Sequence, residues 1–210
     1  MRMELEAGRR LTHASGGVFI LLYIFGLIEW GHLGVLAFAG VSVAGVLEFL
    51  RLFTDVADRL SVLRLVYDRL TRPYEADAPA GYFYYTLGMS GAWLLFPPFA
   101  AVPGMLMLAF GDPFSGVLSD ASPNESKEAW VLVAMFGFCF FVLALPYIHT
   151  KTSLPVSETV LLSAGGAAAA TVADGANVEI GDFFLDDNLT IPIVSGLVIS
   201  GVAATTAAFT

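Results

Sequence analysis

The sequence predicts an all-α, polytopic integral membrane protein with about seven transmembrane helices, one or two of them short or kinked. Of the 210 residues, 57% are hydrophobic and only 14% are charged, and the mean hydropathy is +0.75. A water-soluble domain is rarely so apolar. At this length the chain has room for one membrane domain, residues 1–210, with a cytoplasmic segment at about 51–80.

Hydropathy places the spans along the chain. The candidate segments are 14–30, 33–50, 83–96, 97–111, 129–148, 156–174 and 190–209. The third and fourth are short and carry Pro97, Pro98 and Pro103, so we expect a kinked pair or a re-entrant segment there. Residues 29–32 form the expected turn between the first two spans.

The charged residues support this order of spans. With the N-terminus in the cytoplasm, every basic residue except Lys151 falls on the cytoplasmic side, as the positive-inside rule requires. Every acidic residue except Glu29 and Glu158 falls there too. We therefore expect a multi-pass protein of the cell membrane whose polar groups, and any active site, lie on the cytoplasmic face.

The composition also excludes several functions. The formal net charge is −9, so no basic groove is expected and nucleic acid is an unsuitable partner. So acidic a membrane protein, poor in lysine, is typical of a halophile with high internal salt. The single cysteine, Cys139, excludes disulfides and cysteine metal sites. Walker A, HExxH, CxxC and GxSxG patterns are absent.

The segment 51–80 contains an amphipathic helix. Its charged residues lie off one helix face, and its apolar residues share that face. These apolar residues are Leu52, Val56, Leu60, Leu63 and Val66. We expect this helix to lie along the membrane surface. The small residues of 163–170, together with Gly196, would allow close packing of helices.

The last apolar run begins with the most informative motif, LDDNLTIPIVSG (185–196). Pro192 suits the first turn of a helix, and a hydroxyl or amide before it, at Thr190 or Asn188, would cap that helix. A capped helix does not explain the adjacent acids Asp186 and Asp187, which repel each other. Beside a bilayer, two such carboxylates indicate a bound cation or a cationic partner.

Two polar clusters lie on the same face near the first two spans. Arg10 and His13 enter the first span, either as topogenic and interfacial residues or as part of a site. Glu48 and Arg51 are spaced i, i+3 at the end of the second span and can form an ion pair. A carboxylate where the hydrocarbon begins is costly without a purpose, so a functional role for this pair stays open.

Further acids follow the fourth and sixth spans. In FGDPFSG (110–116) the glycines, beginning with Gly111, and Pro113 predict a break in the helix that puts Asp112 at membrane depth. Non-helical backbone at that depth lines a polar cavity. Asp174 ends the sixth span. Acids converging from several helices could hold Mg²⁺ through oxygen ligands. Scattered interfacial acids are the alternative.

These motifs resemble the family of dolichol kinases, phytol kinases and yeast-type diacylglycerol kinases, which use CTP as the phosphate donor. The resemblance spans most of the chain: EAGRRLTHASGG (6–17), LEFLRL (47–52), GYFYYTLG (81–88), FGDPFSG (110–116), ATVAD (170–174) and the C-terminal DDNLTIPIVSG occur in family order. After FGDPFSG the family carries further basic residues. Here the segment is shorter and acidic, and only Lys127 and Glu128 correspond.

The resemblance implies a kinase that phosphorylates a long-chain isoprenoid alcohol with CTP and Mg²⁺. The metal or phosphate-linked set is Asp112, Asp186 and Asp187. Asn188 would orient a ligand oxygen, and His13 or Glu48 would be the base. Phosphate neutralisation and nucleotide binding are assigned to Arg10, Arg51, Gly111, Lys127 and Thr190.

Two alternatives remain open. A CTP-dependent cytidylyltransferase making a CDP-lipid needs similar acids and a metal, but it releases pyrophosphate where a kinase releases CDP. The other alternative is a catalytically inactive relative or a small transporter. The missing basic stretch after FGDPFSG favours the inactive relative. A transporter is expected to carry its charges mid-span, whereas these acids sit at span ends. The sequence carries no signal for the oligomeric state.

Overall fold

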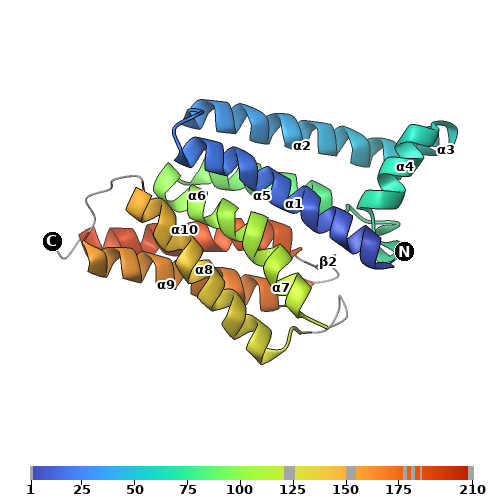
Figure 1. Cartoon of the computed structure of the whole chain (residues 1–210). Coiled ribbons are helices and arrows are strands. Elements are labelled where there is room, and N and C mark those ends of the chain that lie inside the picture. Colours follow the sequence, from blue (N-terminus) through green and yellow to red (C-terminus); the bar gives the residue numbers. More distant parts are fainter. Residues whose placement is uncertain are drawn as a thin grey trace.

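Long helices lie side by side along one common direction (Figure 1). The computed structural model describes the backbone of residues 2–120, 126–149, 155–176, 179–180, 183–184 and 186–207. It describes the side chains of residues 13–56, 59–120, 126–144, 155–176 and 186–206.

Successive long helical segments run in opposite directions along the bundle (Figure 1). Before the fourth expected span the elements are α1 (Arg2–Ile24), α2 (Trp30–Phe53), α3 (Val56–Arg59), α4 (Ser61–Leu70), the 3₁₀ turn η1 (Pro73–Glu75) and α5 (Gly81–Leu95). From the fourth expected span onward they are α6 (Pro98–Leu106), the π turn η2 (Met107–Gly111), α7 (Asp112–Leu118), α8 (Ala129–His149), α9 (Val156–Gly175) and α10 (Asp187–Ala207). Between α9 and α10, β1 (Glu179–Ile180) pairs antiparallel with β2 (Phe183–Phe184).

The prediction of a helical membrane protein is confirmed in its coarser form. Within the described residues, four helical segments are long and apolar enough to cross a membrane: Trp30–Phe53, Pro98–Leu118, Val156–Gly175 and Asp187–Thr206. Shorter apolar helices lie at His13–Ile24 and Ala129–Ala144, and α5 has 15 residues. Helices thus occupy all seven expected places, and the number of spans remains a prediction.

The segment formed by α6 and η2 runs through the middle of the bundle. Met105, Met107 and Leu108 are almost completely buried there, and α1, α5, α8 and α10 pack around this segment. The largest contact between helices joins α9 to α10. A Cβ on Gly166 would come within 2.8 Å of Ile199, so the small residues of 163–170 do allow a close approach, as predicted.

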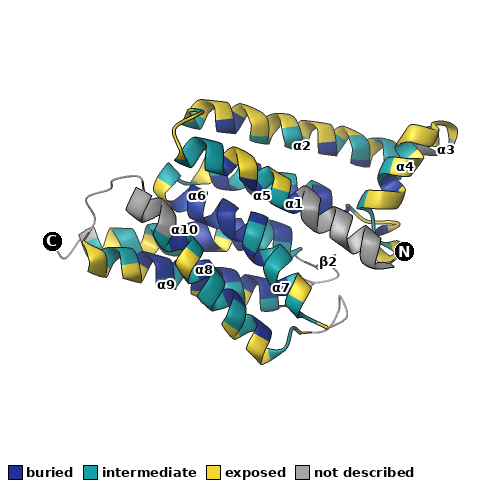
Figure 2. Ribbon diagram, in the orientation of Figure 1, coloured by how far each residue is buried: buried dark blue, intermediate teal, exposed yellow. Residues whose placement is uncertain are grey.

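The outward surface of the bundle is apolar. Along α2 the exposed side chains include Val35, Val43 and Phe49, and much of this helix lies open at the edge of the molecule (Figure 2). A contiguous apolar surface of this extent is unfavourable in water. Together with the long apolar helices it indicates a membrane-associated protein.

The expected break in FGDPFSG is wrong. Residues 98–118 form one continuous helical path, in which η2 is a single π turn directly before Asp112. Pro113 has no N–H, and in a regular α-helix its ring would collide with the carbonyl group of Ala109. The wider π turn, in which the Asp112 N–H donates to the Met107 carbonyl group, accommodates the proline without a break.

The last helix also begins earlier than expected. It starts at Asp187, so Pro192 lies inside α10 and not in its first turn. Because Pro192 lacks an N–H, the Asn188 carbonyl oxygen loses its usual helical donor. A Cβ on Gly104 of α6 would lie 2.7 Å from the Pro192 carbonyl oxygen. The neighbouring helix therefore approaches α10 at the proline.

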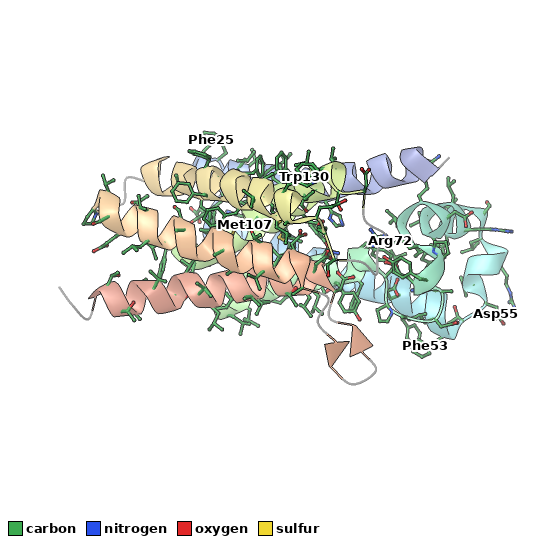
Figure 3. All side chains as sticks on the ribbon, turned by 90° about the horizontal axis from the view of Figure 1, so that it is seen from below. Phe25, Phe53, Asp55, Arg72, Met107 and Trp130 are labelled. Atoms are coloured by element: carbon green, nitrogen blue, oxygen red, sulfur yellow. The ribbon has the colours of Figure 1, made fainter. Side chains whose placement is uncertain are left out.

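The segment expected as one amphipathic helix is divided. Thr54 ends α2 in an extended conformation, and Leu60 separates α3 from α4. Arg72 and Asp55 both lie at the end of the bundle that carries α3 and α4 (Figure 3). In α4, Tyr67 is buried and its hydroxyl donates to the Leu47 carbonyl group over 2.9 Å, which fastens this helix to the end of α2.

Candidate functional site

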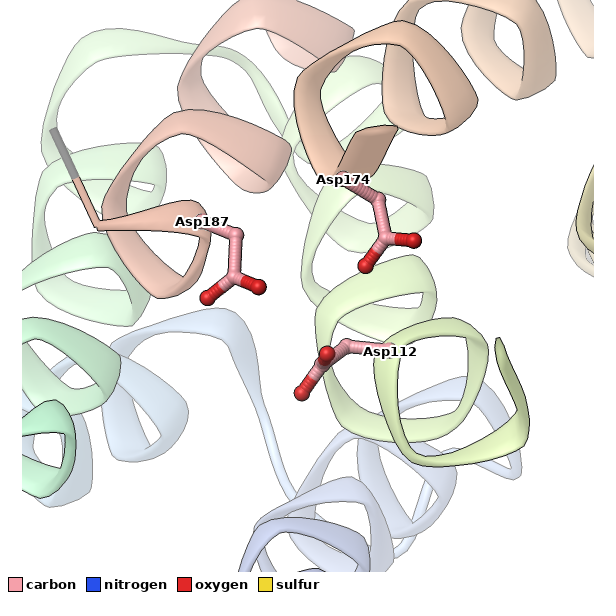
Figure 4. Close-up of side chains that lie close together, drawn as sticks. All are labelled: Asp112, Asp174 and Asp187. Carbon is pink, nitrogen blue, oxygen red and sulfur yellow. The ribbon is translucent and has the colours of Figure 1, made fainter. Parts of the chain in front are cut away.

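Three carboxylates from different parts of the chain converge at one end of the bundle. Asp112 is the first residue of α7, Asp174 the next-to-last residue of α9, and Asp187 the first residue of α10. One carboxylate oxygen from each lies within 4.8 Å of the others, and the three side chains point toward one another (Figure 4). Sequence reasoning placed all three acids on one face but left Asp174 out of the metal set.

Asp186 precedes α10 and contacts the first turn of this helix. Its Oδ1 accepts the backbone N–H of Asn188 over 2.9 Å and the side-chain amide of Asn188 over 2.6 Å. Asp186 therefore caps α10. Burial, followed by repulsion from Asp187, raises the pKa of Asp186 to about 7. The metal set suggested by the structure is Asp112, Asp174 and Asp187.

Lys127 reaches into this cluster from the segment before α8. Its Nζ lies 2.7 Å and 2.8 Å from the two carboxylate oxygens of Asp174, and 2.9 Å from Ser115 Oγ. The nearest oxygen of Asp112 is 3.9 Å away. Burial alone would lower the pKa of Lys127, but the carboxylates of Asp174 and Asp112 outweigh it and raise the pKa above its ordinary value. The ammonium group therefore stays charged.

His13 lies on the other side of Asp112. Its Nδ1 is 3.3 Å from Asp112 Oδ2, and its ring stacks on Tyr85 with 4.5 Å between centroids. The Tyr85 hydroxyl donates to the His13 carbonyl group over 2.8 Å. His13 is 5% exposed, and its Nε2 has no hydrogen-bond partner. Buried polar atoms are normally paired, so a ligand atom would satisfy this nitrogen.

Asn188 presents a second unpaired atom beside the aspartates. Its side-chain nitrogen lies 3.3 Å from Asp187 Oδ1, whereas its Oδ1 is buried without a partner. Carboxylate and amide oxygens are the ligands that Mg²⁺ prefers in proteins. Among the described residues, three carboxylates face one ammonium group, and a divalent cation would reduce the repulsion between these carboxylates. The residues present therefore fit Mg²⁺.

Glu48 and Arg51 form a separate, fully paired network. Arg51 donates to both oxygens of Glu48, over 2.7 Å and 3.2 Å. Glu48 also accepts the backbone N–H of Ala80 over 3.2 Å and a hydrogen bond from the hydroxyl of Tyr82. The Arg51 guanidinium donates further to the carbonyl groups of Glu75, Ala76 and Ala78. These contacts tie α2 to the start of α5.

Gly81 lies between that network and the aspartates. A Cβ on Gly81 would be 3.5 Å from Asn188 Nδ2 and 3.5 Å from Glu75 Oε1. Glu75 is buried and accepts the backbone N–H of Gly81 over 3.2 Å and that of Arg72 over 2.7 Å. The Glu48–Arg51 pair therefore borders the site and does not enter the aspartate cluster.

The remaining expected site residues have varied positions. Gly111 faces α8, where a Cβ would lie 2.8 Å from Cys139 Sγ, so the absence of a side chain at this position allows the two helices to pack closely. The Thr190 hydroxyl lies 3.4 Å from the carbonyl oxygens of Asp186 and Asp187 in the first turn of α10. The side chain of Arg10 lies outside the described residues.

Sequence reasoning missed Ser115 and Tyr85 as site neighbours. Ser115 is completely buried and is spaced i, i+3 from Asp112, so helical geometry at FGDPFSG would have put it on the same face. Tyr85 carries no comparable signal, because its stacking on His13 depends on how α1 packs against α5. Comparisons with protein-family models, with curated proteins and with solved structures find no match to this chain.

Proposed function

We propose that this protein is a metal-dependent phosphotransferase that phosphorylates the hydroxyl group of a long-chain isoprenoid alcohol, with CTP as donor. The observation that carries the proposal is the convergence of three carboxylates, a half-buried ammonium group and an unpaired histidine nitrogen where the apolar helices end. A lipid alcohol would leave its chain among the helices and lipids and bring its hydroxyl to this end.

In this proposal Mg²⁺, when bound at the aspartates, would neutralise the phosphate oxygens of the donor and place them for transfer. Lys127 would neutralise a further phosphoryl oxygen. Phosphoryl transfer requires little covalent participation by the protein and depends on position and charge. The composition of the site therefore supports the proposed reaction.

The contacts of His13 and Glu48 distinguish these two candidates for the general base. Both oxygens of Glu48 already accept hydrogen bonds, from Arg51, Ala80 and Tyr82. His13 keeps Nε2 unpaired while Nδ1 faces Asp112. This arrangement supports His13 as the acceptor of the alcohol proton, oriented by Asp112.

We propose that the site faces the cytoplasm. The aspartates, Lys127 and the segment from Arg51 to Arg72 lie at one end of the bundle, whereas Glu29 and Glu158 begin helices at the other. The positive-inside rule assigns the arginine-rich end to the cytoplasm. Seven spans in the cell membrane would satisfy this orientation.

The test is a transfer assay on the purified full-length chain in lipid. CTP or ATP labelled at the γ-phosphate is incubated with Mg²⁺ and a panel of prenols and, in separate reactions, prenyl phosphates, with the Asp187→Asn variant as the control. Labelled prenyl phosphate and CDP, formed by the wild type only, would support the proposal. Pyrophosphate release with transfer of the cytidylyl group would identify the cytidylyltransferase. Absence of both products with every donor would favour an inactive relative.

A further inference from the structure

We infer that Tyr85 is a positioning residue that fixes the ring of His13 for the transfer step. The inference rests on the proposed function, in which His13 accepts the proton of the alcohol. It goes beyond that function by assigning the residue that holds the imidazole ring in place.

Two glycines of α1 admit Tyr85 directly beside His13. Gly16 and Gly17 follow His13 by three and four residues, so the three positions lie on one face of the helix. A Cβ on Gly16 would overlap the hydroxyl group of Tyr85. A Cβ on Gly17 would overlap the ring of Phe110 in η2. Because both positions lack a side chain, α5 and η2 can approach the turn that carries His13.

Tyr85 holds the histidine at two points. Its hydroxyl donates to the His13 carbonyl group over 2.8 Å, which fixes the backbone. Its ring stacks on the imidazole with 4.5 Å between the centroids and 29° between the planes, which fixes the side chain. Tyr85 and His13 are both buried, so water does not compete for either contact.

Stacking fixes the plane of the imidazole and leaves its nitrogen atoms accessible to other partners. The χ2 torsion of histidine has broad minima, so one contact at Nδ1 does not define the ring plane. Asp112 supplies that contact, with 3.3 Å between Nδ1 and its Oδ2. Tyr85 covers a face of the ring, whereas the nitrogen atoms lie on its edge. Nδ1 can therefore face Asp112 while Nε2, which has no hydrogen-bond partner, is held in one direction.

The first measurement is kinetic and uses the transfer assay on the full-length chain. Tyr85→Leu removes the stack, and we expect kcat to fall by about 10- to 100-fold, because a base displaced by about 1 Å loses rate. The KM for both substrates should stay within about threefold of the wild type, since binding is not affected. Tyr85→Phe keeps the stack and should retain kcat within about threefold.

Tyr67→Leu is the matched control. Tyr67 is also buried, and its hydroxyl also donates to a backbone carbonyl group, that of Leu47. It lies in α4 and does not contact the histidine. Its replacement should lower stability and leave kcat within about threefold of the wild type.

A second variant moves the ring of Tyr85 without replacing it. Gly16→Ala puts a methyl group onto the hydroxyl of Tyr85, so the tyrosine has to shift and kcat should fall. Gly16→Ala/Tyr85→Phe removes that hydroxyl, and the nearest ring atoms then lie 3.1 and 3.2 Å from the new Cβ. We expect this double variant to recover kcat to within about threefold of Tyr85→Phe alone. Gly16→Ala keeps the test decisive if Tyr85→Leu does not fold.

A third measurement does not depend on activity. The chain contains three histidines, and His13→Gln identifies the nuclear magnetic resonance signal of the His13 ring protons in ¹³C-histidine-labelled protein in lipid nanodiscs. An aromatic ring stacked on the imidazole shifts this signal through its ring current. We expect the signal to move in Tyr85→Leu and to keep its position in Tyr85→Phe.

The outcomes that contradict the inference are distinguishable. If Tyr85→Leu, or Gly16→Ala in its place, keeps the wild-type kcat while His13→Gln loses it, Tyr85 only packs and the proposed function survives. If the His13 signal is unchanged in Tyr85→Leu, the stack does not form, and the inference is wrong whatever the activity. If the wild type shows no transfer, or His13→Gln leaves kcat unchanged, the proposed role of His13 fails and the inference falls with it.

Discussion

Gly88 of α5 lies so close to the backbone carbonyl oxygen of Asn188 that a Cβ at position 88 would overlap it, and would also meet Pro192 Cγ at 3.0 Å. The carbonyl group involved is the one that Pro192 deprives of its helical N–H donor. The turn that carries Asp187 and Asn188 is therefore seated directly on α5, with no side chain between the two backbones.

This contact predicts that Gly88→Ala damages the site through its supporting helix. The new methyl group has to displace the first turn of α10, and overpacking of this kind costs about 1–3 kcal/mol. We expect a lower melting temperature and a larger loss of transfer activity than the stability change explains. Gly40→Ala on α2, whose Cβ would meet only Thr86 Cγ2 at 3.6 Å, is the control and should be neutral or slightly stabilising. Equal effects of both substitutions would contradict the prediction.

Chelation should abolish activity reversibly. Asp112, Asp174 and Asp187 would hold the cation, so excess EDTA should abolish transfer, and added Mg²⁺ should restore it in the wild type. In Asp187→Asn, activity should fall by at least about 100-fold and should recover only in part at high Mg²⁺. Transfer rates measured against Mg²⁺ concentration check this. Undiminished turnover in excess EDTA would remove the metal from the mechanism.

Replacing His13 or Glu48 with glutamine should have different effects. We expect His13→Gln to lower kcat by roughly 100-fold or more, because the alcohol proton loses its acceptor, while the protein stays folded. Glu48→Gln breaks a buried ion pair and should cost about 3 kcal/mol of stability. Thermal unfolding measured beside kcat and KM separates the two. A large kcat effect from Glu48→Gln at full stability would return Glu48 to the list of bases.

Gly111 is predicted to matter for packing and not for nucleotide binding. Gly111→Ala puts a methyl group 2.8 Å from Cys139 Sγ, so we expect a loss of about 1–3 kcal/mol with little change in the KM for the nucleotide. Cys139→Ala in the same chain should recover most of the lost stability by removing the sulfur. Gly137→Ala on α8 has nothing within 4 Å of the new Cβ and serves as the control. A specific rise in KM without destabilisation would restore the phosphate role of Gly111.

Hydropathy located the helices of this fold because a helix that crosses a membrane needs a long apolar run, and such runs are easily found in the sequence. The acids at 112 and 187 could be predicted as a site because each interrupts an apolar run, where a charge is costly. The same reasoning assigned Asp186 to the metal, since a sequence does not reveal which of two adjacent carboxylates turns back to cap its own helix.

Other parts of the site depend on contacts between distant segments. Lys127 and Asp174 are 47 residues apart, and neither has a local pattern that identifies the other as its partner. The segment around Pro113 was expected to break because proline is costly in a regular helix. Whether the chain breaks there or takes in one extra residue as a π turn depends on how tightly the neighbouring helices enclose it. Here most residues of η2 are buried, so the helix is enclosed and continues.

The π turn η2 has a consequence for chain length. A π turn holds one residue more than an α turn, so everything after it is rotated by about 100° relative to an uninterrupted α-helix. Asp112 and Ser115 both follow η2 and both face the aspartate cluster. Shortening η2 by a single residue would turn these two side chains away from the aspartate cluster while leaving the composition almost unchanged. The direction in which this acid points is thus set by the number of residues before it, and an alignment that shifts by one position here would assign the acid to the wrong side of the helix.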